Sequence, residues 1–130
     1  MVKQHKPDVI FILSVDTEEE WDWSGEFPQK NFSVSNIEQI PKLPAFCDSL
    51  GIRPTYFTDY AVADDPDAVE ILKTIVDKNA CEIGAHLHPW CNPPFQGITK
   101  DRESNIVKLP ISKVIEKMDA LIELINKKYG

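Results

Sequence analysis

The fold is decided by the stretch Val9-Ile10-Phe11-Ile12-Leu13-Ser14-Val15, a continuous run of residues most of which favour β-strands. An unbroken apolar run of this length predicts a strand that is buried on both faces, as in a parallel sheet. The run is too short to span a membrane and lacks a small-residue cleavage site, so we do not interpret it as a secretory signal. A cytoplasmic location is the resulting expectation.

Outward from this run, the chain alternates predicted helices and strands. Two further strands are expected at residues 54–58 and 81–88, and helices at about 40–50, 66–78 and 112–125. Gly51 and Asn79 are suited to end the first two helices, and Ser112 to cap the third. The apolar face of the third helix is predicted to be buried and comprises Val114, Ile115, Met118, Leu121, Ile122 and Ile125. The order β-α-β-α-β-α predicts an α/β fold with parallel strands, and residues 1–130 are interpreted as a single domain.

Composition excludes several classes of function. The chain is 42% hydrophobic and 27% charged with a net charge of −7, which is typical of a folded domain. Its acidity argues against nucleic acid or a membrane surface as a partner, because both require a basic face. The odd number of cysteines, without CxxC spacing, favours a reducing compartment over a disulfide framework.

The first motif with chemical potential is Ser14-Val15-Asp16-Thr17-Glu18, at the end of the first predicted strand. Side chains alternate along an extended segment, so Asp16 and Glu18 are expected on the same side. The carboxyl end of a buried strand is where α/β proteins build their sites, and a cation would offset the repulsion between two carboxylates. A solvated acidic loop is the alternative interpretation.

The second motif is Gly84-Ala85-His86-Leu87-His88-Pro89-Trp90, at the end of the third predicted strand. His86 and His88 share a side by the same alternation, and a His-x-His pair on a strand can chelate zinc. A carboxylate from a neighbouring strand would complete a site with three protein ligands and one open position. The alternative is one histidine in the core and one on the surface.

Other side chains near these motifs have open roles. Trp21 and Trp23 could stack on sugar rings or fold their loop against the domain, and Trp90 could shape the pocket or pack in the core. Asp59 ends the second predicted strand and is expected to face the same pocket, as a hydrogen-bond partner of a histidine or as a substrate contact. Cys91 is a further candidate metal ligand.

Together the two motifs resemble those of the polysaccharide deacetylase family, also called the NodB-homology or carbohydrate esterase family 4 group. The Asp16-Thr17-Glu18 segment is similar to the family's Asp-Asp motif in an Asp-x-Glu variant, and His86-Leu87-His88 is similar to its His-x-x-x-His motif. Trp90 stands where the family's second histidine falls, and Thr17 stands where its aspartate ligand falls. The resemblance covers roughly residues 8–128 and implies the front half of a distorted (β/α)7-type barrel.

The resemblance also implies roles for individual residues. Asp16 would be the base that takes a proton from the attacking water, and a divalent metal, expected to be zinc, would be held by Glu18, His86 and His88. The implied activity is removal of N-acetyl groups from an amino sugar in a polysaccharide or its precursor. The expected substrate contacts are Trp21, Trp23, Trp90 and Asp59.

Two alternatives remain at this point. One is a metal hydrolase that acts on a different amide or on a phosphoester, because a fold alone does not choose the substrate. The other is a non-catalytic or truncated domain that binds metal or sugar. Such a partial barrel would associate with itself through its open strand edges.

Overall fold

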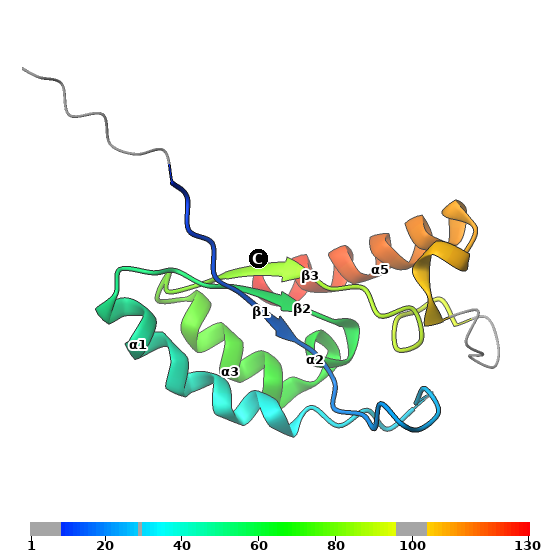
Figure 1. The fold of residues 1–130 in the computed structure, drawn as a ribbon, viewed down its shortest axis with the longest axis horizontal. Coiled ribbons are helices and arrows are strands. Elements are labelled where there is room, and N and C mark those ends of the chain that lie inside the picture. Colours follow the sequence, from blue (N-terminus) through cyan, green and yellow to red (C-terminus); the bar gives the residue numbers. More distant parts are fainter. Residues whose placement is uncertain (1–8, 29, 96–103) are drawn as a thin grey trace, which may run out of the picture.

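The three predicted strands form one parallel sheet in the order β1-β2-β3 in a computed structural model that describes residues 9–28, 30–95 and 104–130 (Figure 1). The strands are β1 (Ser14–Thr17), β2 (Thr55–Thr58) and β3 (Glu82–Ala85). Thr17 pairs with Thr58 and Thr58 with Ala85, so all three strands end at the same level. The chain therefore leaves the sheet at one edge, inside each of the two predicted motifs: after Thr17 in the first and after Ala85 in the second.

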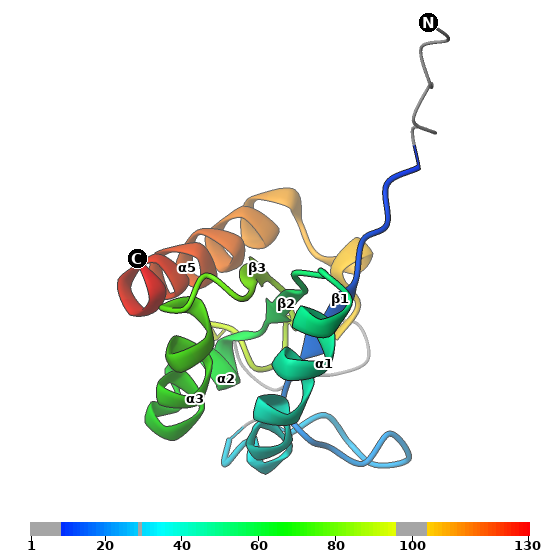
Figure 2. The ribbon, with the colours of Figure 1, turned by 90° about the vertical axis from the view of Figure 1, so that its left-hand side faces the viewer.

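Helices cover one face of this sheet, and a further helix lies along its β3 edge. Figures 1 and 2 show α1 (Leu43–Ser49) and α3 (Pro66–Val76) beneath the sheet and α5 (Ile111–Tyr129) beside β3. The core between sheet and helices is built around Tyr56 and Leu72, both fully buried. Over the described residues, the helical elements are the 3-10 helices η1 (Ser35–Lys42) and η2 (Ile106–Lys108) and the α-helices α1 (Leu43–Ser49), α2 (Tyr60–Asp64), α3 (Pro66–Val76) and α5 (Ile111–Tyr129).

The predicted first strand is wrong over most of its length. β1 begins only at Ser14, and Val9, Ile10, Phe11 and Ile12 are between 70% and 85% exposed. The backbone ladder to β2 starts where Thr55 donates to Leu13, at 2.9 Å. Strand propensity alone therefore does not make this run a strand in the described part of the chain.

The helix ends follow local backbone rules with two exceptions. Gly51 (φ 65°) and Asn79 (φ 54°) adopt the left-handed conformation expected after the first two helices. The first α-helix starts later than predicted, because Pro41 lies in the 3-10 turn η1 that precedes it. The last helix begins at Ile111, so Ser112 lies inside its first turn and is not its cap.

The last helix is less buried than its sequence predicts. Leu121 is fully buried, whereas Ile115 and Ile122 are 53% and 44% exposed. The apolar stripe is wider than the surface against which α5 packs, so part of it faces outward in the described structure. The prediction that the entire stripe is core is wrong for these isoleucines.

Within the described ranges, no helix combines the length and the apolar character needed to cross a bilayer. The cysteines Cys47, Cys81 and Cys91 are buried and free.

The mixed α/β arrangement with parallel strands is confirmed. The front half of a deacetylase barrel, and self-association through its edges, stay predictions.

Candidate metal centre

The site is assembled from the segments that follow the three strands. Backbone hydrogen bonds continue the sheet one residue beyond its end: Asp59 donates to Thr17 (3.1 Å) and His86 donates to Thr58 (3.0 Å). Glu18, Asp59 and His86 are the first residues after β1, β2 and β3. The carboxyl ends of parallel strands thus carry the polar residues, as expected for an α/β site.

Glu18, His86 and His88 converge through their ligand-type atoms, and we call them the ligand triad. Glu18 Oε2 lies 2.8 Å from His86 Nε2 and 3.3 Å from His88 Nε2. The two Nε2 atoms are 3.0 Å apart. The structure therefore brings together the three side chains predicted as metal ligands.

The donor set and its spacing fit a small divalent ion. Two nitrogen or oxygen ligands bound at about 2.0–2.1 Å to a tetrahedral ion lie roughly 3.3 Å apart. The separations in the triad, from 2.8 to 3.3 Å, are close to that spacing. The side chains of His86 and Glu18 are 27% and 25% exposed, so solvent reaches the triad from one side. A site of this kind can bind an ion and still admit water or a substrate.

The other ring nitrogen of His88 contacts a second glutamate. His88 Nδ1 lies 2.9 Å from Glu19 Oε2, and Trp90 Nε1 donates to Glu19 Oε1 at 2.6 Å. The Glu19 side chain is buried. Burial acts to raise the pKa of Glu19, but its hydrogen bonds and electrostatic interaction with His88 and its hydrogen bonds with Asp59 and Trp90 outweigh burial and lower that pKa. Glu19 is therefore an ionised, fully hydrogen-bonded carboxylate.

Asp59 accepts a hydrogen bond from the backbone of Glu19 and so helps to fix its position. Its Oδ2 accepts from the backbone N–H of Glu19 (3.1 Å), and its Oδ1 accepts from Val62 (2.8 Å) as the N-terminal cap of α2. Burial, followed by the hydrogen bond and the charge of Glu19, raises the pKa of Asp59. Asp59 is fully enclosed, so the predicted substrate contact is not what its position supports. Its Oδ2 lies 3.9 Å from His88 Nδ1, too far for a hydrogen bond, so Asp59 is linked to the histidine ring through Glu19.

A second group of ligand-type atoms lies behind the triad. Glu19, Asp59, His88 and Cys91 form a buried cluster that could hold a metal ion. Both oxygens of each carboxylate already accept protein hydrogen bonds. Burial raises the pKa of the Cys91 thiol, which favours the protonated form and disfavours a thiolate ligand. The two groups share His88, through Nε2 in the triad and through Nδ1 in the buried cluster.

Asp16, the predicted base, lies outside both groups. Its side chain is exposed on β1, two residues before Glu18, and it is not among the residues whose ligand-type atoms cluster. The face it occupies is opposite to that of the buried Thr17. Asp16 therefore does not contribute a ligand-type atom to the triad.

The predicted aromatic contacts form one cluster that reaches the site. Trp90 is buried and stacks on His88 with ring centroids 4.3 Å apart. Trp21 lies 5.7 Å from Trp90 and 4.4 Å from Trp23, which is 72% exposed. Of these rings, Trp23 is the one open to a large ligand, while Trp90 packs against the histidine.

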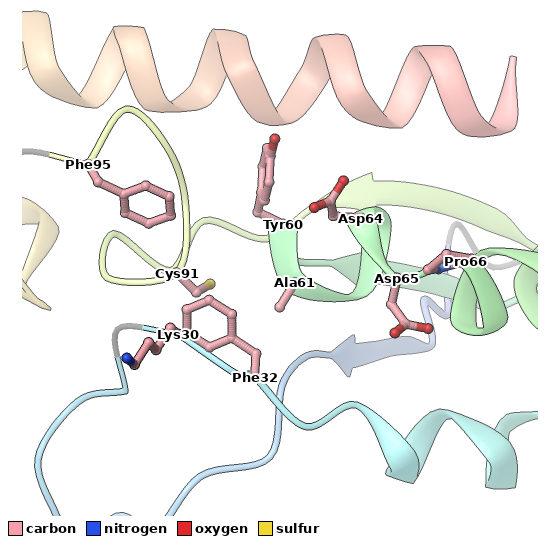
Figure 3. A pocket seen from close by; sticks show the side chains of 9 residues that line it. All are labelled: Lys30, Phe32, Tyr60, Ala61, Asp64, Asp65, Pro66, Cys91 and Phe95. Carbon is pink, nitrogen blue, oxygen red and sulfur yellow. The ribbon is translucent and has the colours of Figure 1, made fainter.

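A separate pocket of about 410 Å³ lies near Cys91 (Figure 3). Phe32, Tyr60 and Phe95 supply aromatic walls, and Lys30 and Asp64 supply charges. No member of the ligand triad is among its described lining residues. The pocket is therefore distinct from the ligand triad, although Cys91 lines it and also belongs to the buried cluster.

Glu19 is the important residue that the sequence analysis did not identify. The available signal was the run Glu18-Glu19-Glu20, in which consecutive side chains point to opposite sides. Glu20 is exposed and accepts from Ser33 and Ser35, so the three neighbours have three different surroundings. Only the position of Trp90 in space distinguishes the buried member.

The comparisons with known proteins returned no matching family model, no matching curated protein and no matching solved structure.

Proposed function

We propose that this chain is the metal-binding part of a carbohydrate N-deacetylase, with Glu18, His86 and His88 as ligands and zinc as the expected ion. The observation that carries the proposal is the convergence of one carboxylate and two imidazoles from the ends of β1 and β3, within 3.3 Å of one another. The sequential parallel strands, with α1 and α3 on one face, support the further proposal of a partial barrel.

The ligand triad is the better metal site of the two groups. Its members are partly open to solvent, as a hydrolytic site requires, whereas the cluster around Cys91 is buried. A metal in the buried cluster would have to replace hydrogen bonds that Glu19 and Asp59 already accept. In the triad, an ion would replace only the contacts that the three ligand-type atoms make with one another.

The residues around the triad suggest how an amide would be bound and hydrolysed. A bound divalent ion would act as a Lewis acid and lower the pKa of water at the site. Asp16, exposed at the same edge of the sheet, is the proposed acceptor of a proton from the attacking water. Trp23, with Trp21 behind it, offers an aromatic face to a sugar ring.

A second candidate is a domain that binds metal or sugar without hydrolysis. The observation that favours it is the position of Asp16 outside the cluster of ligand-type atoms. In addition, both histidines of the described part belong to the triad, which leaves no further histidine there to protonate a departing amine.

Metal analysis of the purified protein is the first test. We expect about one zinc per chain in the wild type and none in the Glu18→Ala and His86→Ala variants. Glu20→Ala is the matched control, because it removes an exposed carboxylate two residues from Glu18 and should keep the metal. Zinc retained in the first two variants would refute the site.

Acetate release from an oligomer of N-acetylhexosamine separates the candidate functions. Asp16→Asn should keep the metal and abolish acetate release. Metal binding without acetate release from the wild type would favour the non-catalytic candidate. Activity on a phosphoester or another amide, in the absence of deacetylation, would favour a different hydrolase.

A further inference from the structure

His88 is held through both of its ring nitrogens. Nε2 faces Glu18 and His86, and Nδ1 lies 2.9 Å from Glu19 Oε2 in a buried contact. A carboxylate can only accept hydrogen bonds, so the hydrogen in this contact resides on Nδ1. The lone pair of a neutral imidazole then lies on Nε2, on the side of the ligand triad.

We propose that Glu19 is a positioning residue that fixes the tautomer and the ring orientation of His88 for metal binding, an inference that rests on the proposed metal site. Carboxylates that accept from the distal nitrogen of a histidine ligand fix its tautomer and raise its basicity. Glu19 is next to a ligand in the sequence but faces the opposite side of the imidazole. Glu18 and Glu19 therefore have different roles.

The surroundings of Glu19 make it a rigid support. Its second oxygen accepts from Trp90 Nε1 at 2.6 Å, and its backbone N–H donates to Asp59 at 3.1 Å. Asp59 is in turn held by the first turn of α2. The Trp90 ring also stacks on His88 with an interplanar angle of 23°. The imidazole is thus constrained in its plane by Glu19 and across its face by Trp90.

Glu19→Gln is the informative substitution because it keeps the size of the side chain. The carboxamide has one acceptor oxygen and a donor NH2 group, yet it would face two donors, Trp90 Nε1–H and His88 Nδ1–H. One contact must then place a donor against a donor. His88 relieves this by moving its hydrogen to Nε2, which removes the lone pair needed for metal binding.

Zinc affinity, measured by competition with a chromophoric chelator, tests the proposal in the full chain. We expect Glu19→Gln to weaken zinc binding by about 10–100-fold. The matched control Glu20→Gln changes an exposed carboxylate and should stay within about twofold of the wild type. Equal affinities of Glu19→Gln and wild type would overturn the positioning role and leave the metal site intact.

A second measurement separates this inference from the proposed function. Long-range ¹H–¹⁵N spectra report histidine tautomers, and the chain has only three histidines, so single His5→Ala and His86→Ala variants assign the signals of His88 by elimination. The expected result in the metal-free wild type is a His88 hydrogen on Nδ1, with a shift toward Nε2 in Glu19→Gln. If the wild type binds no zinc, the proposed function fails, and the spectra still decide the role of Glu19. A neutral His88 with its hydrogen on Nε2 in the wild type would overturn it.

Discussion

Replacing Trp90 by phenylalanine tests the buried network beneath the ligand triad. The indole N–H donates to Glu19 Oε1 at 2.6 Å, and the ring is 7% exposed. Phenylalanine keeps an aromatic ring beside His88 but removes the donor. A buried, ionised carboxylate would then lose one of its hydrogen bonds.

The magnitude follows from the charge on the acceptor. A hydrogen bond to a charged group contributes about 1.5–3 kcal/mol, and leaving the acceptor unsatisfied costs an amount of this order. We therefore expect Trp90→Phe to lower the free energy of unfolding of the metal-free protein by about 2–3 kcal/mol, mostly from this bond. With a urea m-value of about 1–3 kcal/mol/M, the midpoint should fall by roughly 1 M.

Trp21→Phe is the matched control for this experiment. Trp21 belongs to the same aromatic cluster, but its buried Nε1 has no hydrogen-bond partner among the described residues. Removing that N–H sacrifices no hydrogen bond, so the free energy of unfolding should stay within about 1 kcal/mol of the wild type. Urea unfolding followed by far-UV circular dichroism compares the two variants.

The result that refutes the reasoning is an equal loss of stability in both variants. Equal losses would mean that ring packing, and not the bond to Glu19, determines the cost. A larger loss in Trp21→Phe would refute it more strongly.

Three further predictions concern stability. Asp59→Ala leaves two buried backbone N–H groups without an acceptor and should lower the free energy of unfolding by about 2–4 kcal/mol. Asp65→Ala, which removes the N-terminal cap of α3, is the control and should lower it by about 1 kcal/mol; thermal unfolding measures both. Gly84→Ala places a Cβ 2.6 Å from the ring of Phe57 and should lower the free energy of unfolding by about 1–3 kcal/mol. The double variant Gly84→Ala/Phe57→Leu should regain part of this stability, as measured by urea unfolding. Zinc at 100 times its dissociation constant should stabilise the wild type by about 2.7 kcal/mol, and a chelator should reverse this in a thermal scan; an unchanged midpoint would count against the metal site.

The meeting of Glu18, His86 and His88 could be predicted because it depends on two simple properties of sheets. Side chains alternate with a period of two, and the carboxyl ends of parallel strands meet at one edge. His86 and His88 follow the end of β3, so this part of the prediction did not depend on the length of the strand, whereas the choice of Glu18 over Asp16 as a ligand came from the resemblance to the deacetylase motif.

The failures concern properties that depend on partners distant in sequence. The run from Val9 to Ile12 has strand propensity, but in the described structure these residues are between 70% and 85% exposed and the ladder to β2 begins only at Leu13. Ile115 and Ile122 belong to an apolar stripe whose burial depends on what packs against α5. Glu19 could not be told from Glu18 and Glu20 without the position of Trp90.

His88 lies between two consecutive glutamates, one at each ring nitrogen. Neighbours in an extended chain face opposite ways, so a single residue inserted between Ser14 and Glu18 would move Glu18 into the place of Glu19 and Glu19 into the place of Glu20. Glu18, the proposed metal ligand, would then be enclosed beside Trp90, and Glu19 would face solvent. The few positions that lead out of β1 must therefore keep their number for the ligand triad and its buried support to form together.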